Sequence, residues 1–358
     1  MSIFLAILLT LADPQPGRME TVRVADDHRG FVLAPSGQKF TPWGLNYGNA
    51  GRLIEDFWET DWPTVAHDFE AMKGMGANVA RVHLQFGKFM DTAAQPNQKA
   101  LDRLGRLVEL AEKTGLYLDL TGLACYRKAD VPPWYDSLSE SDRWSAQAVF
   151  WGAVAKVCAP SPAIFCYDLM NEPLSGGDRK PGEWYSGKLF GSYDFLQWIT
   201  LENRNRPREE IARLWIKRLS AAIHEHDKRH LITVGLLPWM PDWGHLSGFI
   251  PKTVAPELDF VSVHIYPEKG KVDQALLGLK KFDVGKPVVI EETFPLSCPP
   301  SDLEDFIKRS RPNASGWMQH YDGASLDQLK ALQTKGTITL PQSIYLEGLA
   351  LFQKLSPK

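Results

Sequence analysis

Short apolar runs alternate with longer amphipathic stretches along most of the chain. Eight short runs are typical of buried β-strands, and they cover residues 41–46, 78–83, 116–121, 163–170, 231–235, 258–264, 287–292 and 314–319. Stretches with helical apolar spacing cover residues 62–75, 98–114, 139–157, 207–227, 272–281, 301–309 and 341–355. This alternation indicates βα units around a parallel sheet, and eight is the strand number of a (β/α)8 TIM barrel. The pattern therefore predicts an α/β fold with one barrel domain.

Two further segments extend this plan. Short strand-like runs at residues 21–24 and 31–34 predict a short N-terminal hairpin, so the main domain would span residues 21–358. After the fourth strand, residues 174–206 show no regular period and are rich in aromatic side chains. A loop of that length in a compact domain is usually functional or disordered, and the aromatic content argues against disorder.

The first 20 residues are expected to be a leader or a flexible N-terminus. Residues 3–12 form an apolar run, and Thr10 and Ala12 are placed like the small residues before a signal-peptidase cleavage site. The run is too short to span a membrane, and no Lys or Arg precedes it. We expect a secreted or periplasmic protein with no membrane span; the alternative is a cytoplasmic protein with a truncated leader or a buried N-terminal segment.

Composition excludes several classes of partner. The 40 basic and 43 acidic residues give a net charge of −3 with no basic run, so nucleic acid is not expected as a ligand. The 4 cysteines lack C-x-x-C spacing, which argues against a zinc site or a redox pair. The 12 tryptophans are unusual and suit contacts with large flat ligands.

Two predicted strands end in glutamates, at Asn171-Glu172-Pro173 and at Glu291-Glu292. The carboxyl ends of barrel strands meet on one face, where barrel enzymes carry their active sites. Hydrolysis of a glycosidic bond requires two carboxyl groups, one to protonate the leaving oxygen and one to stabilise or capture the developing cation. Asn-Glu-Pro alone fits a helix cap or a turn better than an active site. Pro173 also predicts an extended backbone at Glu172.

Side-chain parity adds candidates on other strands. Residues on one face of a strand alternate, so His264 and Tyr266 share a face with Ser262, and Arg81 shares one with His83. An arginine inside the barrel must face a carboxylate, because a lone buried charge costs several kcal/mol. Each residue alone could equally form a structural ion pair or be a core histidine.

Glu291 and Glu292 must have opposite parity. If Val288 and Ile290 fill the barrel, Glu292 faces the lumen with them. Glu291 is then expected to point away or to play a supporting role.

Several stretches together resemble glycoside hydrolases of clan A, and most of all family 5, the family of cellulases and β-mannanases. The matching stretches run from Phe40 to about Tyr321 and include residues 44–47, 76–83, 168–173, 263–267, 286–292 and 315–319. The resemblance implies that Glu172 is the acid/base and Glu292 the nucleophile. It further implies that Asn171 binds the 2-hydroxyl of the sugar.

The same resemblance assigns supporting residues. Arg81 would keep the nucleophile ionised, Tyr266 would hydrogen-bond it, and His264 would be a substrate-site histidine. Trp317 would form the aromatic floor under the reacting sugar. One departure is Thr121, where many members of the family carry histidine, and His83 is a candidate to replace it in part.

Tryptophans in connections that follow strands are candidates for further sugar platforms, because sugar rings stack on aromatic faces. We single out Trp134, Trp184, Trp239 and Trp243. About half of the loop tryptophans are expected simply to pack loops onto the barrel.

The sequence thus predicts a retaining β-glycoside hydrolase that acts by double displacement on a β-linked polysaccharide or oligosaccharide, with glucan or mannan as the first candidates and an endo-β-glucanase or β-mannanase type of action. No metal or organic cofactor is expected, and the protein is expected to be a monomer. One alternative is a non-catalytic carbohydrate-binding barrel, because fold does not fix function. Another is an exo-acting glycosidase or transglycosylase on a different β-glycoside.

Overall fold

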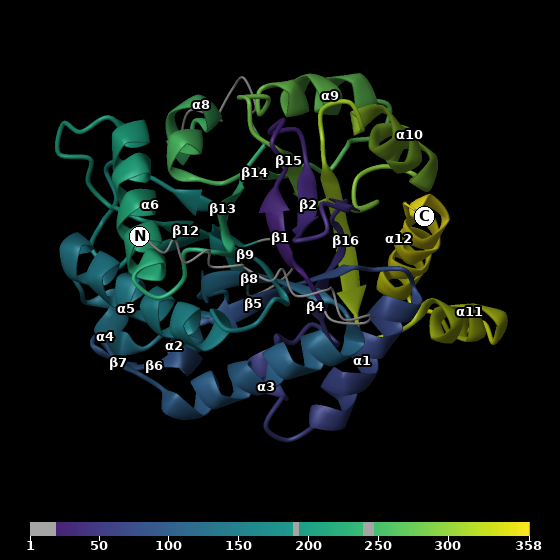
Figure 1. Cartoon of the computed structure of the whole chain (residues 1–358), viewed down its shortest axis with the longest axis horizontal. Coiled ribbons are helices and arrows are strands. Elements are labelled where there is room, and N and C mark those ends of the chain that lie inside the picture. The colour runs from purple at the N-terminus through teal and green to yellow at the C-terminus, as the bar shows by residue number, and fades with distance from the viewer. Residues whose placement is uncertain (1–18, 189–192, 239–246, 358) are drawn as a thin grey trace, which may run out of the picture.

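Eight parallel strands close into a barrel at the centre of the molecule, with helices around it (Figure 1). The structure, a computed structural model, describes residues 19–188, 193–238 and 247–357. The predicted (β/α)8 barrel is confirmed. Its strands, in order around the barrel, are β13 (Leu231–Leu236), β14 (Val261–His264), β15 (Val288–Glu292), β16 (Gly316–Asp322), β4 (Trp43–Gly48), β5 (Val79–Gln85), β8 (Tyr117–Ala124) and β9 (Ile164–Asn171).

The seven predicted helices are all present, with ends within about three residues of the expected positions, the usual uncertainty of such boundaries. They are α1 (Trp62–Gly74), α3 (Gln98–Thr114), α5 (Glu140–Cys158), α6 (Arg208–His224), α9 (Val272–Lys280), α10 (Pro300–Ser310) and α12 (Leu340–Leu355). Helix α3 shows why such boundaries can be read. The side chain of Asn97 caps its first turn, and Gly115 ends it with a φ of 67°, a left-handed conformation that glycine adopts without strain.

Shorter elements were not predicted. They are α2 (Phe86–Phe89), α4 (Pro133–Asp136), α8 (Pro251–Val254), α11 (Leu326–Thr334), the 3-10 turns η1 (Ile54–Asp56), η2 (Lys128–Asp130) and η3 (Ala255–Glu257), and the two-stranded sheet of β6 (Met90–Thr92) and β7 (Gln95–Pro96). Helix α11 did leave a signal, because Ser325 and Gln328 form a capping box at its start. No helix within the described ranges is long and apolar enough to cross a membrane.

The N-terminal hairpin lies across one end of the barrel. Its strands β1 (Thr21–Val24) and β2 (Phe31–Ala34) have the predicted bounds, and β3 (Lys39–Phe40) adds a third strand. The ring of Phe31 contacts Phe165 and Phe260 at centroid distances of 5.2 and 5.3 Å. Both partners belong to the N-terminal ends of barrel strands, so the hairpin closes that end with an apolar plug. The carboxyl ends of the strands are left for the site.

The parity expected on β15 is wrong. Val288 and Ile290 pack in the apolar cluster between the strands and the helices, whereas Val289 packs with the plug inside the barrel. Glu291 has the parity of Val289 and is fully buried in the lumen. Glu292 still reaches the site, because the pairing of β14 with β15 shifts register before its last pair, so that His264 lies opposite Glu292.

The long loop predicted after β9 is present, and its described residues include a small three-stranded sheet that was not predicted. Strand β10 (Pro173–Leu174) pairs with β12 (Asp194–Trp198), and β12 pairs with β11 (Tyr185–Lys188). The sheet also contacts the barrel mouth, where the backbone N–H of Asp194 donates to the carbonyl of Tyr126 at 2.7 Å. The aromatic residues of this segment therefore pack an additional layer over one side of the barrel's carboxyl end.

Candidate active site

Glu172 and Glu292 lie next to each other at the mouth of the barrel. Nδ1 of His264 is 2.9 Å from Oε1 of Glu172 and 3.6 Å from Oε2 of Glu292. His264 is fully buried, whereas the two glutamate side chains keep 14% and 11% of their surface exposed. The two carboxyl groups can therefore meet a ligand from solvent, while the histidine beneath them cannot.

Arg81 supplies the positive charge under this pair. Its Nη1 lies 2.6 Å from Oε1 of Glu292, and its Nη2 lies 2.7 Å from Oδ2 of Asp168. Both Arg81 and Asp168 are fully buried, so the carboxylate expected opposite this arginine is present twice. Asp168 also accepts hydrogen bonds from the hydroxyl of Thr121 and the backbone N–H of Gly235. Thr121 thus has a partner in the barrel wall and supports the arginine indirectly.

Tyr266 contacts the other oxygen of Glu292. Its hydroxyl donates to Oε2 at 2.6 Å and lies 2.8 Å from Nε2 of His320, whose ring stacks on the tyrosine ring. His320 was not predicted. A signal was available, because His320 directly follows the predicted strand 314–319, at the carboxyl end where barrel enzymes carry their active sites.

Asn171 and His83 complete the polar rim. Oδ1 of Asn171 accepts from Nη2 of Arg81 at 3.2 Å, and its Nδ2 donates to the carbonyl of Phe195 at 3.3 Å. His83 lies 3.3 Å from Nη1 of Arg81 and 2.5 Å from the hydroxyl of Tyr126. The structure therefore brings together seven of the eight residues proposed for the catalytic and supporting roles: Glu172, Glu292, Arg81, His83, Asn171, His264 and Tyr266.

Trp317 is the exception. Its indole N–H donates to Oγ of Ser310 on α10, and its ring lies 6.2 Å from that of Trp43 in the layer between strands and helices. Trp317 therefore faces away from the lumen and offers no floor for a sugar. The error is one residue of strand parity, because His320 and Met318 occupy the lumenal face of β16.

The four candidate platforms differ. Trp184 is only 3% exposed, and the guanidinium of Arg143 covers its ring at 4.3 Å, so it is a packing residue. Trp134, in α4, is half-buried beside Phe86 of α2 and keeps part of its surface accessible. Trp239 and Trp243 lie outside the described residues.

Charges around the pair set the ionisation of Glu292. Burial alone would raise its pKa, but the neighbouring His264 and Arg81 outweigh burial and hold the pKa of Glu292 well below its usual value. For His264, burial alone would lower the pKa, but Glu292, Glu172 and Glu291 raise it to about 10. Near neutral pH the site therefore holds an anionic Glu292 and a cationic His264.

The backbone of Glu172 is not extended as predicted. Its φ is +46°, in the left-handed region that side chains other than glycine rarely adopt. The residue is held there by its backbone N–H, which donates to the carbonyl of Gly235, and by its contact with His264. Such local strain costs about 1–3 kcal/mol and persists where the surrounding structure enforces it.

Among the described residues, two groups of side chains have the spacing of metal ligands. One is the pair Glu172 and Glu292 with His264, whose ligand atoms lie within 4.8 Å of one another. The other, also within 4.8 Å, is Asp119, Cys166 and Glu291 in the lumen below. Both groups already neighbour the Arg81 guanidinium, which supplies the positive charge that a metal would bring.

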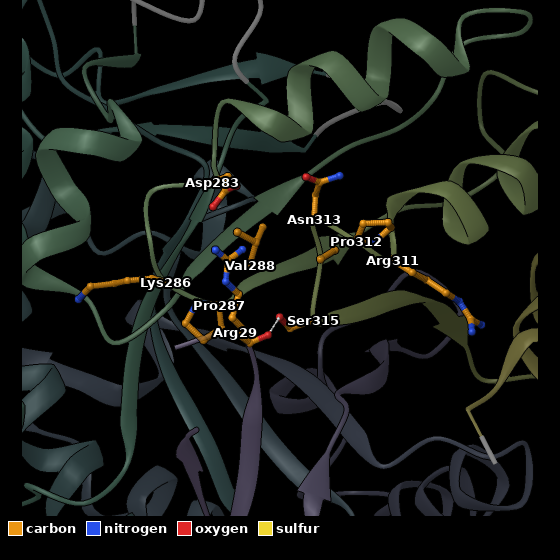
Figure 2. Close-up of a pocket in the computed structure, with 10 residues that line it drawn as sticks. Arg29, Asp283, Lys286, Pro287, Val288, Arg311, Pro312, Asn313 and Ser315 are labelled. Atoms are coloured by element: carbon orange, nitrogen blue, oxygen red, sulfur yellow. Dashed lines mark hydrogen bonds between the residues drawn. The ribbon is translucent and has the colours of Figure 1, made fainter. Parts of the chain in front are cut away.

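A separate hollow of about 110 Å³ opens at the other end of the barrel (Figure 2). Pro287 and Val288 at the start of β15 line it, and Ser315 donates a hydrogen bond to the carbonyl of Arg29 across it. None of the clustered carboxylates lies there, so this hollow is no part of the candidate active site.

Comparisons with known proteins agree with this geometry. The model of the family described as Cellulase (glycosyl hydrolase family 5) matches residues 35–293. A curated protein of Arabidopsis thaliana, mannan endo-1,4-beta-mannosidase 2, is 30% identical over 139 residues, which are 34% of this chain and 25% of that protein.

Two solved structures illustrate the likeness of fold. An exo-beta-1,4-mannosidase from Opitutaceae bacterium strain TAV5 has a TM-score of 0.66 at 17% identity, covering 93% of this chain and 61% of that one. A beta-mannanase from the blue mussel Mytilus edulis has a TM-score of 0.61 at 14% identity, covering 95% of this chain and 97% of that one. The chain thus spans less than two thirds of the plant protein and of the bacterial exo-mannosidase.

Proposed function

Because the chain belongs to glycosyl hydrolase family 5, we propose that it hydrolyses β-linked mannan or manno-oligosaccharides with retention of the anomeric configuration. The observation that carries the proposal is the contact of one nitrogen, Nδ1 of His264, with both Glu172 and Glu292. Such contact requires two carboxyl groups close together on one side of a buried cation.

The separation of the carboxyl groups favours retention. Retaining enzymes place them about 5–5.5 Å apart, whereas inverting enzymes leave about 6.5–9.5 Å for a water molecule. Oxygens of Glu172 and Glu292 lie within 4.8 Å of each other. This closest approach is shorter than the separation typical of inverting enzymes and supports the retaining arrangement.

The first half of the reaction uses the two glutamates in different protonation states. Glu292 attacks the anomeric carbon as a carboxylate, because Arg81 and Tyr266 hold its two oxygens by hydrogen bonds at 2.6 Å each. Glu172 gives its proton to the leaving oxygen. The bond between the two sugars breaks as the ester with Glu292 forms.

In the second half, water replaces the leaving sugar. Glu172, now a carboxylate, takes a proton from this water, which attacks the anomeric carbon and releases Glu292. His264 remains 2.9 Å from Oε1 of Glu172 and its positive charge stabilises the carboxylate form. The acid of the first step is thereby the base of the second.

Mannan is proposed over glucan because the named relatives act on mannans or mannosides. Glucan remains the alternative that the family allows. A carbohydrate-binding barrel without catalysis would have no use for an arginine and a tyrosine that hold Glu292 in its ionised form.

Action at chain ends is a second candidate, favoured by one feature of the barrel mouth. The hydroxyl of Tyr193, next to β12, donates to the carbonyl of Gly51 at 2.6 Å, and Nη2 of Arg127 reaches the same carbonyl at 3.2 Å. Arg127 also lies over the Tyr193 ring at 4.9 Å. These contacts join the connections after β4, β8 and β9. A mouth bridged in this way would stop a polysaccharide from passing through on that side.

One experiment tests both candidates. Purified protein is incubated with β-mannan, mixed-linkage glucan, cellulose derivatives and xylan, beside Glu292→Ala and the matched surface control Glu347→Ala on α12. We expect reducing ends from mannan with the wild type and the control, and none with Glu292→Ala. Activity that survives Glu292→Ala would sink the assignment of the nucleophile.

Early products decide the finer points. Proton NMR of the first product should show the β-anomer before mutarotation; an α-anomer would exclude retention. Short products of mixed length indicate internal cleavage, whereas single sugars or one short unit indicate action at chain ends. In the second case Tyr193→Ala with Arg127→Ala should open the mouth and increase internal cleavage.

A further inference from the structure

Glu291 forms a second, hidden carboxylate next to the candidate nucleophile. It is fully buried in the lumen, with Oε2 3.5 Å from Nε2 of His264 and 3.6 Å from Nη2 of Arg81. These three groups converge on Gly235, where an added Cβ would lie 2.9 Å from the histidine, 3.0 Å from the arginine and 3.2 Å from Glu291. Only a glycine leaves the room for them.

A fourth ionisable group faces Glu291 from below. Asp119 on β8 is fully buried, and one of its carboxyl oxygens lies within 4.8 Å of an oxygen of Glu291 and of Sγ of Cys166. All four carboxyl oxygens of Asp119 and Glu291 lack a hydrogen-bond donor among the described residues. Two buried carboxylates cannot both remain ionised without donors at such a distance, so the pair must hold a proton.

The partners of Arg81 and His264 indicate which of these buried groups carry a positive charge. Arg81 is always cationic, and its two terminal nitrogens donate hydrogen bonds to Glu292 and Asp168. His264 presents one ring nitrogen to Glu172 and the other to Glu291. Two acidic partners on opposite sides of one ring favour an imidazolium with both nitrogens protonated.

We propose that Asp119, Glu291 and His264 form a buried proton-sharing row that ends on Glu172, in which Glu291 is a positioning residue that keeps His264 cationic. Asp119 holds the proton of the carboxyl pair and donates it in a hydrogen bond to Glu291. Glu291 is the anion that faces the histidine. This inference rests on the proposed function only in assigning Glu172 as the group that the row serves.

The electrostatics of the lumen agree with this assignment. Burial and the charge of Glu291 raise the pKa of Asp119 well above its usual value. Burial alone would raise the pKa of Glu291 too, but Arg81 and His264 outweigh it and lower it. The ionisable groups around His264, from every strand near it, are Glu172, Asp168, Glu291, Glu292, Arg81, Asp119, Tyr266, His83 and His320.

A metal ion is the competing occupant of the Asp119, Cys166 and Glu291 group. Burial raises the pKa of Cys166 well above its usual value, and the neighbouring Glu291 anion raises it further, so its thiolate is disfavoured. Glu291 already faces two cations, Arg81 and His264. A third positive charge there would be repelled, and a proton satisfies the pair without it.

A cationic His264 beneath Glu172 would stabilise the carboxylate that Glu172 forms after it has given up its proton. An imidazolium gives Oε1 of Glu172 a charge-assisted hydrogen bond that strengthens when Glu172 loses its proton. The glutamate can then wait as a carboxylate while water enters, after the leaving sugar has gone. Without Glu291, His264 would have one fewer anion to hold its charge, and this support would weaken with rising pH.

The direct test follows the charge of His264 by NMR in full-length protein labelled with 15N in its histidines. His264 is assigned by comparison with His264→Gln. In the wild type we expect an imidazolium signal well above neutral pH. Glu291→Gln should lower the His264 titration by roughly 1–3 pH units, the shift that one nearby opposite charge produces. Asp119→Asn is the matched control and should leave it in place, because Asp119 already carries no charge.

A second measurement covers the case in which Glu291→Gln does not fold. Infrared spectroscopy at neutral pH should show a protonated carboxyl band in the wild type that Asp119→Asn removes in part. An unchanged band in Asp119→Asn overturns the inference, and so does an unchanged His264 titration in Glu291→Gln. The inference is also overturned if Asp119→Asn lowers the titration pH of His264 as much as Glu291→Gln does. In that case Asp119, and not Glu291, would be the anion that keeps His264 cationic.

Neither measurement needs a substrate, so failure of the proposed function and failure of this inference can be told apart. On an aryl β-mannoside with a good leaving group, the first step needs little acid catalysis, and release from Glu292 limits the rate. There Glu291→Gln should lower kcat at alkaline pH more than Asp119→Asn does. Equal losses in the two variants would indicate packing alone and contradict the row.

Discussion

Replacing Arg81 should destabilise the barrel by several kcal/mol, because this arginine is a buried charge shared by several partners. Its guanidinium is fully buried and makes hydrogen bonds to Asn46, Glu292, Asp168 and Asn171 at 2.7, 2.6, 2.7 and 3.2 Å. Arg81→Met keeps most of the apolar stem but leaves three carboxylates, those of Glu292, Asp168 and Glu291, without their shared cation.

The magnitude follows from what each carboxylate retains. Breaking a buried ion pair by removing one partner costs about 3–5 kcal/mol. Asp168 keeps two donors, Thr121 and the N–H of Gly235. Glu292 keeps Tyr266 and His264, and Glu291 keeps its contact with His264. We therefore expect the lower end, about 3 kcal/mol of lost unfolding free energy.

Arg81→Lys should lose less stability than Arg81→Met, because it keeps the charge. One ammonium cannot reproduce a planar group that reaches Glu292 with one nitrogen and Asp168 with the other. We expect a loss of about 1–2 kcal/mol, between the values for a neutral hydrogen bond and for a broken buried pair.

Urea unfolding followed by circular dichroism measures these losses, with Arg309→Met as the matched control. Arg309 also contacts two carboxylates, Asp273 and Asp305, but its side chain is 47% exposed, so its removal should cost less than about 1 kcal/mol. If Arg81→Met costs no more than Arg309→Met, the buried ion-pair argument fails. Adding Asp168→Asn to Arg81→Met should recover part of the loss by removing one stranded charge.

Activity gives a second readout of Arg81→Met. Loss of the cation raises the pKa of Glu292, which must be ionised to attack, so the acid limb of kcat/KM should move to higher pH. An unmoved acid limb in a folded Arg81→Met protein would show that Arg81 does not control the ionisation of the nucleophile.

Three further predictions concern neighbouring groups. Glu172→Gly should be about 1–2 kcal/mol more stable to urea than Glu172→Ala, because only glycine adopts a φ of +46° without strain; equal stability would remove the strain argument. His320→Gln keeps an N–H donor for Tyr266, whereas His320→Phe does not. The glutamine variant should therefore have a kcat up to about tenfold higher, the effect of one hydrogen bond. Equal kcat values would contradict the role of that contact. The wild type should lose unfolding free energy between pH 6.5 and 10. The folded protein raises the pKa of His264 from 6.5 to about 10, so this histidine stabilises the fold fully below pH 6.5 and progressively less up to pH 10. Urea midpoints across this range should fall in the wild type and change less in Glu291→Gln.

Periodicity made the barrel predictable. Each strand is a short apolar run bounded by polar turns, and each helix has an apolar stripe, so both patterns survive in the sequence without tertiary information. The need of Arg81 for a carboxylate was also predictable, because a buried lone charge is too costly to persist. The identity of these carboxylates could not be predicted, because Asp168 and Glu292 belong to strands on different sides of the barrel.

Side-chain parity failed where either face of a strand could carry the residue. The alternation that makes a strand readable also means that one residue of slip moves a side chain to the other face. At Glu291 and Trp317 the sequence offers two acceptable faces, and only the pairing with neighbouring strands decides between them. Trp184 failed for another reason, because the Arg143 that covers its ring comes from α5, about 40 residues earlier in the sequence.

Two adjacent glutamates can serve one site because β15 ends at the register shift. A regular strand would send Glu291 and Glu292 to opposite faces, and one of them would be lost to the helix layer. Here Glu291 lies in the lumen at 3.5 Å from one nitrogen of His264, while Glu292 at the rim lies 3.6 Å from the other. The histidine is thereby held between a carboxylate that never meets substrate and two that do. A single charged ring can then link the buried proton of Asp119 to the ionisation of the reacting pair.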